Sequence, residues 1–252
     1  MKNLYRVAIM MAAVVALVIT SAPAYASKMD DRIELTARNS YVFKTYLQDD
    51  DIKIDSKDGA VTLTGIVSGE YHKTMAQETV TGLPGVISVD NRLEAKGAPP
   101  TANSDAWLRD KVKATLWFHR SVSARTTEVD VTDGIVTLRG NAVSHAQKSL
   151  TTEYARDVEG IKDVNNEMIV IESSKKKRTA NEKIDDASIT AQVKMALLLH
   201  RSTSALNTTV STKNGVVTLG GKAGNAAELR LVSRLVNDIN GVKRVRNWMT
   251  IG

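Results

Sequence analysis

The sequence contains no cysteine, only 4 prolines, and only 2 Phe and 3 Trp among its 252 residues. Without cysteine, the chain can form neither a disulfide nor a thiolate metal site, and it cannot carry a lipid on an N-terminal cysteine. Hydrophobic residues still make up 42% of the chain, which is enough to bury cores. Because large aromatic side chains are scarce, we expect several small domains rather than one large one.

One long apolar run is present, and it stands at the start of the chain. Lys2 and Arg6 precede the uncharged run 7–19, and Ala24-Tyr25-Ala26 then supplies the small residues that signal peptidase requires. The run is too short to span a bilayer, and no second one follows. The sequence therefore predicts a cleaved signal peptide over residues 1–26 and a soluble periplasmic protein that is not a lipoprotein. Full secretion is the alternative.

Three segments of nearly the same sequence recur along the chain. Residues 58–66, 133–141 and 214–222 align at offsets of 75 and 81 residues. In each, β-branched residues alternate around an Asp-Gly or Asn-Gly pair, which is a strong hairpin signal because the tight turn needs positive φ. Recurrence at nearly fixed spacing indicates copies of one structural unit.

The same register extends over a whole unit. Apolar residues at a period near 3.6 predict one helix before each hairpin and a second helix after it. Ser144 with Gln147 and Asn225 with Glu228 have capping-box spacing at the start of the second helix, whereas the first copy offers only Ser68 as a cap. A strand with the pattern V-x-N-x-L/M closes each copy.

The sequence thus predicts an α+β fold of three tandem αββαβ modules, each a small sheet covered by two helices. We expect the modules over residues 31–95, 105–171 and 185–251. The Gly- and Pro-containing linker 96–104 and the Lys-rich linker 173–183 separate them. Units of roughly 65 residues fold alone only marginally, so packing between modules is an alternative to independent modules.

Together, the D/N-G-x-V-T-L-x-G hairpin, the later Gly-Val or Gly-Ile pair and the V-x-N-x-L/M ending resemble the BON-domain family. Members of this family include osmotically induced periplasmic proteins and outer-membrane lipoproteins. The resemblance covers residues from about 31 to 251 three times over. It implies an αββαβ fold, residence in the periplasm, no enzymatic activity, and binding to phospholipid or to envelope proteins. The lack of cysteine departs from the lipoprotein members.

The polar residues provide no candidate catalytic or metal site. His119 and His200 occupy equivalent positions in His-Arg-Ser segments at the end of a predicted first helix, where a cationic side chain interacts favourably with the helix dipole. We interpret both as helix-capping residues, because no metal-ligand spacing accompanies them. The acidic run 49–51 lacks EF-hand spacing and is interpreted as a solvated loop. We expect no enzyme activity, no metal and no cofactor.

Charge distinguishes the three copies. Residues 27–97 and 98–172 carry net charges of −3 and −2, whereas the linker 173–183 and residues 184–252 carry +4 and +5. An anionic surface is the natural partner for such a basic third module. Ordinary solubilising charge is the alternative interpretation.

Strand alternation then selects candidate residues. In the third closing strand it places Arg244, Arg246 and Trp248 on the face opposite to the V-x-N-x-M residues, which the helices are expected to cover. Arg230 and Arg234 are expected to form a separate patch on the outer face of the second helix. The candidate lipid-binding residues are Arg244, Arg246, Trp248, Arg230, Arg234 and Lys222. The alternative is that Trp248 packs against a neighbouring module and never meets lipid.

The leading functional hypothesis is a non-enzymatic envelope protein that binds anionic phospholipid and supports envelope integrity during osmotic or envelope stress. The second is a protein-interaction or chaperone-like factor that presents sheet edges to envelope proteins. Nucleic acid suits the charge but not the export signal or the lack of an aromatic-basic RNA motif, so no nucleic-acid partner is expected.

Overall fold

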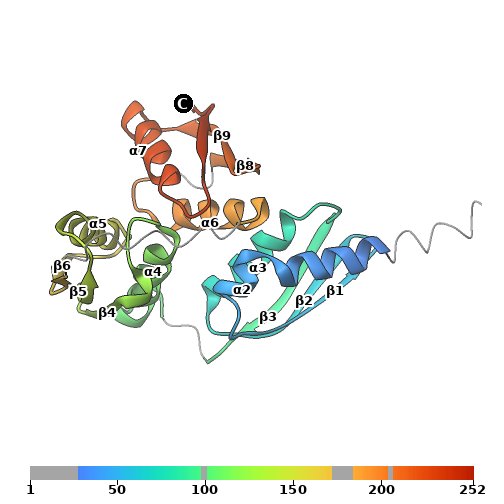
Figure 1. Cartoon of the computed structure of the whole chain (residues 1–252), viewed down its shortest axis with the longest axis horizontal. Helices are drawn as coiled ribbons and strands as arrows, with labels where there is room; N and C mark the ends of the chain where they lie inside the picture. Colours follow the sequence, from blue (N-terminus) through green and yellow to red (C-terminus); the bar gives the residue numbers. More distant parts are fainter. Residues whose placement is uncertain (1–27, 98–100, 172–183, 204–206) are drawn as a thin grey trace, which may run out of the picture.

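The computed structural model describes residues 28–97, 101–171, 184–203 and 207–252. The predicted signal peptide, the Lys-rich linker 173–183 and residues 98–100 of the first linker lie outside the described residues. The described chain forms three αββαβ units in sequence order, which we call modules 1, 2 and 3 (Figure 1). The predicted α+β class and element order are confirmed.

Each module has a helix, a β-hairpin, a second helix and a closing strand. In module 1 these are residues 28–39 with the short α2 (Tyr41–Thr45), β1 (Asp51–Lys57), β2 (Ala60–Val67), α3 (Glu70–Thr81) and β3 (Ser88–Ala95). In module 2 they are α4 (Asp105–Phe118), η1 (Ala124–Thr126), β4 (Thr127–Thr132), β5 (Ile135–Ala142), α5 (His145–Arg156), β6 (Asp163–Asn166) and β7 (Ile169–Val170). In module 3 they are α6 (Asp186–Leu199), β8 (Thr208–Lys213), β9 (Val216–Ala223), α7 (Ala226–Asn237), β10 (Arg244–Asn247) and β11 (Thr250–Ile251).

The three sheets share one topology. The second hairpin strand is central in each, with its hairpin partner antiparallel on one side and the closing strand parallel on the other. A parallel pair needs a crossover connection, and the second helix supplies it. The helices therefore cover one face of each sheet and leave the other face free of helices.

The hairpin turns have the backbone that the sequence predicts. Asp58 and Gly59 have φ of 52° and 79°, and the Asp-Gly and Asn-Gly pairs of modules 2 and 3 repeat these values within a degree. In module 1 the turn is also held by Asp30, whose carboxylate accepts from the N–H groups of Asp58 (2.9 Å) and Gly59 (3.0 Å). These hydrogen bonds lower the pKa of Asp30, the Gly59 bond contributing most.

This carboxylate recurs at the start of the first helix in every module. Asp105 and Asp186 accept from the two turn N–H groups of modules 2 and 3 in the same way.

The asparagine of the closing motif makes a second hydrogen bond that recurs in every module. The Nδ2 atoms of Asn91, Asn166 and Asn247 donate to carbonyl oxygens of the second helix at 2.9–3.1 Å. The hairpin and the closing strand are thus each tied to a helix.

The predicted helix caps are confirmed in modules 2 and 3. The side chains of Ser144 and Asn225 accept backbone N–H groups at the starts of α5 and α7. The prediction of Ser68 as the cap in module 1 is wrong, because the N-cap of α3 is Gly69. The Ser68 hydroxyl donates instead to Asp50 (2.6 Å).

The interpretation of the acidic run 49–51 as a solvated loop is wrong for Asp50. The Asp50 side chain is 1% exposed and accepts hydrogen bonds from the backbone and hydroxyl of Ser68, with the His72 ring 2.5 Å away. Burial raises the pKa of Asp50, but the bonds from His72 and Ser68 outweigh it and hold the pKa below its usual range. This aspartate is a buried structural acceptor and not part of a solvated loop.

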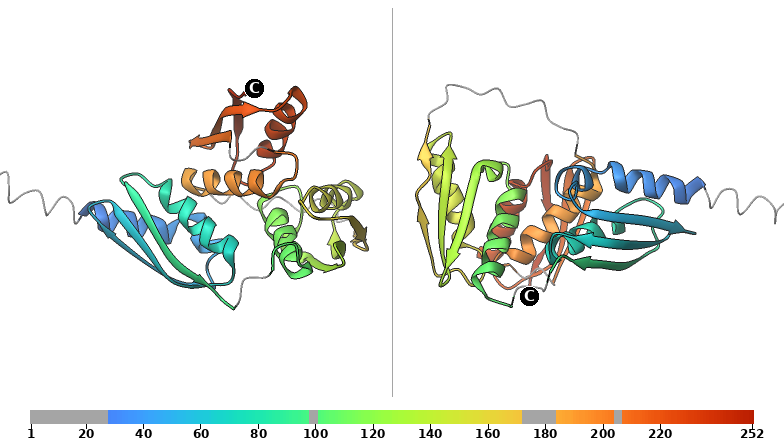
Figure 2. Two further views of the ribbon diagram at one scale, coloured as in Figure 1. Left: turned by 180° about the vertical axis from the view of Figure 1, so that it is seen from behind. Right: turned by 90° about the horizontal axis from the view of Figure 1, so that it is seen from below.

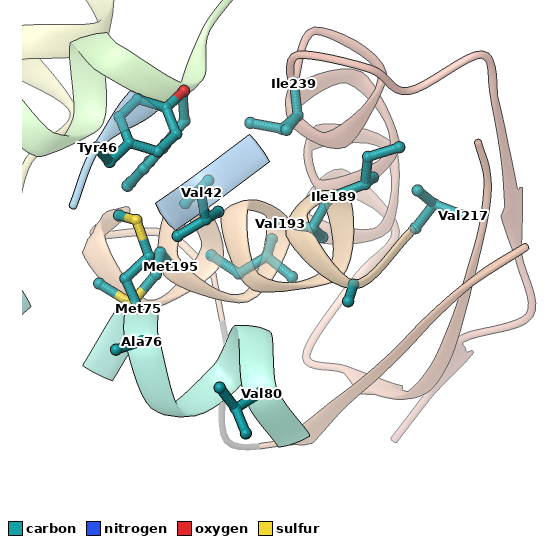
Figure 3. Packing of buried hydrophobic residues seen from close by; sticks show 14 of the residues in the cluster. Val42, Tyr46, Met75, Ala76, Val80, Ile189, Val193, Met195, Val217 and Ile239 are labelled. Carbon is teal, nitrogen blue, oxygen red and sulfur yellow. The ribbon is translucent and has the colours of Figure 1, made fainter. Parts of the chain in front are cut away.

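The modules are packed together, and α6 lies at their centre (Figures 1 and 2). Figure 3 shows Met75, Ala76 and Val80 of α3 along one side of α6, and Val217 and Ile239 of module 3 along the other. Buried side chains of modules 1 and 3, with Phe118 of α4, consequently form one continuous cluster, whereas the rest of module 2 has its own core, centred on residues such as Val136 and Leu138.

Polar contacts fix module 1 on this helix. Backbone N–H groups of Tyr41 and Val42 at the start of α2 donate to the side chains of Asp185 (2.8 Å) and Ser188 (3.1 Å). Lys194 forms an ion pair with Glu78 of α3 at 2.5 Å. Module 1 therefore has a defined orientation on module 3.

We predict that Gly65→Ala destabilises the protein by more than about 1 kcal/mol. Gly65 has φ of 122°, and a Cβ built there would lie 1.9 Å from the carbonyl oxygen of Asp51 on the paired strand. The matched control is Gly69→Ser, four residues away, where a Cβ would meet nothing within 4 Å and serine is a favoured N-cap residue. Thermal melting of the full chain measures both variants. Equal melting of Gly65→Ala and the control would contradict the steric argument.

Candidate functional site

The sheet of module 3 has one open face that carries most of the predicted site. Arg244, Arg246 and Trp248 all point outward and are exposed, with Trp248 72% exposed. The intervening Val245 and Asn247 are half-buried under α7. The structure thus gives the alternation that the sequence predicts and does not bury Trp248 against another module.

The register of the sheet adds two lysines to this face. Lys222 on β9 is paired with Thr250, and Lys213 on β8 is paired with Val216, so both side chains share the outward direction of Arg246 and Trp248. We name this surface the basic face; it consists of Lys213, Lys222, Arg244, Arg246 and Trp248. Sequence analysis missed Lys213, although its place directly before the hairpin turn fixes its orientation.

No acidic residue occupies an outward position of β8, β9, β10 or β11. Among the described residues, none of the four cations of the basic face takes part in an ion pair. The charge of this face is therefore not compensated within the described part of the molecule.

The equivalent faces of modules 1 and 2 have the opposite character. In module 2, Arg139 is the only cation at the outward strand positions and bridges Asp130 and Glu167, each at 2.9 Å. The outward acids of module 2 are Glu128, Asp130, Asp163 and Glu167. In module 1, outward cations and acids are mixed along β1 and β3, and Arg92 pairs with Asp90 at 2.7 Å. The same architecture carries uncompensated positive charge only in module 3.

Arg230 and Arg234 lie on α7, away from the basic face. Both are exposed, while Val232 and Val236 of the same helix are buried against the sheet. Because α7 covers the inner face of the sheet, these two arginines occupy the opposite side of module 3. They form a separate patch, as the sequence predicts.

The two equivalent histidines are the C-caps of α4 and α6, as predicted. His119 is 2% exposed and stacks on Tyr154 with 3.7 Å between the ring centroids. Burial lowers the pKa of His119, since desolvation disfavours the charged ring. The prediction of a cationic cap is therefore wrong for His119, because this helix end is buried against module 3.

Each His-Arg-Ser segment docks on the end of the second helix of the other module. The reciprocal backbone contacts are His119 with Ile239 and Arg120 with Asp238 in one direction, and His200 with Val158 and Arg201 with Asp157 in the other. Module 1 has Lys44 and Gly82 at the corresponding positions. It makes no such contact and docks on α6 instead.

Asp238 is the polar centre of this junction. It accepts from the hydroxyls of Ser121 (2.5 Å) and Tyr154 (2.6 Å) and lies 3.5 Å from the Nδ1 atom of His119. Burial raises the pKa of Asp238, but the adjacent His119 ring and the two hydroxyl bonds outweigh it and hold the pKa below its usual range. The carboxylate is therefore charged at neutral pH.

The described residues contain no group of three or more His, Cys, Asp or Glu side chains that could hold a metal ion. Within the same residues, no helix combines the length and apolar character needed to cross a bilayer.

Residues 30–97, 104–172 and 185–252 each match the family model of the BON domain. The chain therefore belongs to the BON-domain family and contains three copies of the domain.

Two curated proteins are similar to this chain. The osmotically-inducible protein Y of Escherichia coli (strain K12) is 28% identical over 143 residues, which cover 55% of this chain and 71% of that protein. An uncharacterized protein in the gshII 5' region of Anaplasma centrale is 30% identical over 147 residues, covering 58% of this chain and 94% of that protein. Among solved structures, CdsD of the Chlamydia trachomatis type III secretion system aligns over 84% of this chain and 90% of its own. Its sequence identity is 18% and its TM-score is 0.24.

We predict that acid weakens the protein through His119. Its folded pKa lies below the unfolded value of about 6.5, so the unfolded chain binds the proton first and stability falls as pH drops below about 6.5. The loss reaches at most about 1.4 kcal/mol per pH unit. Asp238 adds nothing in this range, because a depressed carboxylate loses its contribution only as pH falls below about 4.

Melting curves between pH 7.5 and pH 5 measure this effect. His119→Phe keeps an aromatic ring against Tyr154 and should flatten the pH dependence. His145→Asn, at an exposed position on α5, is the control and should keep the slope of the unmodified protein. An unchanged slope in His119→Phe would show that another group titrates.

Proposed function

We propose that this protein is a non-catalytic periplasmic protein that binds the surface of anionic phospholipid membranes through the basic face of module 3. Through this binding it supports envelope integrity under osmotic stress. The single observation that carries the proposal is the charge contrast between equivalent faces. On the outward faces of modules 1 and 2 the acids outnumber the cations, whereas the outward face of module 3 has four unpaired cations.

The chemistry of the basic face suits a lipid headgroup layer. Each Lys or Arg near an anionic membrane contributes about 1 kcal/mol, and an exposed indole is favoured at headgroup depth. The four cations and Trp248 lie on one side of a small sheet, so they can meet a flat surface together. Such binding is peripheral, reversible and sensitive to salt.

The other modules favour one orientation on the membrane. Their outward sheet faces include the acids of β4, β6 and β3, which an anionic surface repels. Module 3 would therefore contact the lipid while the acidic faces remain in water. The predicted signal peptide and the similarity to an osmotically-inducible protein support the periplasmic and osmotic parts of the proposal.

We predict that the double variant Lys213→Glu/Arg246→Glu binds anionic vesicles at least about tenfold more weakly in 0.1 M salt, since two cations are replaced by anions. Co-sedimentation with phosphatidylglycerol-containing and neutral vesicles measures the difference. The matched control is Lys53→Glu/Lys57→Glu, which makes the same charge change on the outward face of module 1. Lys57 and Lys213 are equivalent in the repeat.

Three results would count against the proposal: equal loss in the control, equal binding to neutral vesicles, or no binding of the unmodified protein. The last of these favours the protein-interaction or chaperone-like hypothesis.

We also predict a blue shift of Trp248 emission on anionic vesicles. A variant with Trp107→Phe and Trp117→Phe retains Trp248 alone, and its exposed indole should emit at long wavelength in buffer. Headgroup contact should move the emission to the blue, and about 0.5 M salt should reverse much of the shift by screening. Neutral vesicles are the control. An emission indifferent to anionic vesicles would remove Trp248 from the binding surface.

A further inference from the structure

A cavity of about 640 Å³ lies where the three modules meet. Helices α3, α4 and α6 form most of its wall, and residues at the end of β3 and after α5 complete it. The volume is within the range of small-molecule binding sites. The cavity is distinct from the basic face, because none of the five residues of that face lines it.

The wall of the cavity is largely apolar and aromatic. Tyr71 comes from α3, Trp107 and Trp117 from α4, and Leu198 from α6. Leu198 is 50% exposed, and Trp117 is also exposed, so large apolar side chains of two modules meet water in a concave site. Burial of this surface by an apolar ligand would be favourable.

One charged side chain is buried in this wall. Lys111 is 5% exposed, and its ammonium lies 3.9 Å from the centroid of the Trp107 ring. Among the described residues, the only carboxylate within ion-pair distance is that of Glu159, at 4.0 Å, and the Glu159 side chain is 75% exposed. Burial lowers the pKa of Lys111, and Glu159 compensates only in part. An anion placed beside Lys111 would replace the lost hydration of the ammonium.

The remaining charges around the cavity add to this imbalance. Of the acids in its wall, Glu70 pairs with Lys73 and Asp110 pairs with Arg109. Lys96 and Lys113 also line the cavity, and neither takes part in an ion pair among the described residues. Two acids of the wall are thus paired with cations outside it, and Lys96 and Lys113 are left unpaired in it.

The fold itself does not require these residues. In modules 1 and 3 the position of Lys111 is held by Thr36 and Gln192, and Trp107 corresponds to Arg32 and Ser188. The lysine beneath an aromatic ring is thus particular to module 2.

We propose that this cavity binds a single-chain amphiphile with an anionic head group, such as a fatty acid or an anionic lysophospholipid. The head group lies at Lys111, and the apolar chain lies along Trp107, Trp117 and Leu198. A helical wall offers no row of free backbone groups for an extended peptide, whereas apolar contact with one cation suits an amphiphile. This inference concerns single lipid molecules and is independent of the membrane binding proposed for the basic face.

The test uses the quenching of tryptophan fluorescence by 12-bromododecanoate below its micellar concentration. In the mature chain carrying Trp248→Phe, the remaining Trp107 and Trp117 both line the cavity. We expect saturable quenching, and at least tenfold weaker binding of an uncharged dodecyl amphiphile in competition. Competition by dodecanoate and by lysophosphatidylglycerol then shows which head group is preferred.

Two variants locate the site. Lys111→Met keeps the length of the side chain without its charge and should weaken binding of 12-bromododecanoate at least tenfold while vesicle binding is unchanged. Lys213→Met, on the basic face, is the matched control and should keep binding of the amphiphile. Leu198→Glu introduces a carboxylate at a half-exposed wall position, so it remains a test if Lys111→Met does not fold.

Quenching that does not saturate would overturn the proposal, as would equal affinity for the uncharged amphiphile or full binding by both Lys111→Met and Leu198→Glu. None of these results bears on the vesicle assay, so a failure of this inference is distinguishable from a failure of the proposed membrane function.

Discussion

The burial of helix α6 on nearly every side is the constraint on which the architecture depends. Ten of its 14 residues are buried, including Ser188 and Gln192, whereas α5 buries only Thr151 and Ala155. A module of roughly 65 residues has too little interior for a large core. By placing α6 between its own sheet and α3, the chain joins two small cores into one. The apolar character of this helix follows from its two sets of neighbours.

Two docking modes arise from one repeated sequence. Modules 2 and 3 dock on each other through equivalent segments, since each has a histidine at the end of its first helix and an aspartate at the end of its second. Module 1 has Lys44 and Gly82 there, so it lacks both the histidine and the aspartate of this junction. Module 1 is therefore free to use α2 and α3 against α6. A few substitutions thus turn three similar copies into an asymmetric assembly.

The sequence predicted what depends on neighbours along the chain. The Asp-Gly and Asn-Gly turns, the caps at Ser144 and Asn225, and the outward direction of Trp248 follow from local backbone preferences and strand alternation. It did not predict the burial of His119, because that depends on the stacked ring of Tyr154 and on Asp238 and Ile239 of module 3, which are distant along the chain. For the same reason the sequence did not predict Lys111 as a binding residue, because its cavity exists only after all three modules have docked.

The shared core also ties the completion of module 1 to the order in which the chain is made. A ribosome synthesises the N-terminus first, so α3 is finished well before residues 186–199 exist. Until α6 arrives, the side of α3 that carries Met75, Glu78 and Gly82 lacks the cover that α6 gives it in the finished protein. Met75 therefore stays in contact with water until α6 has been made. A truncation before α6 would leave that side of α3 open permanently.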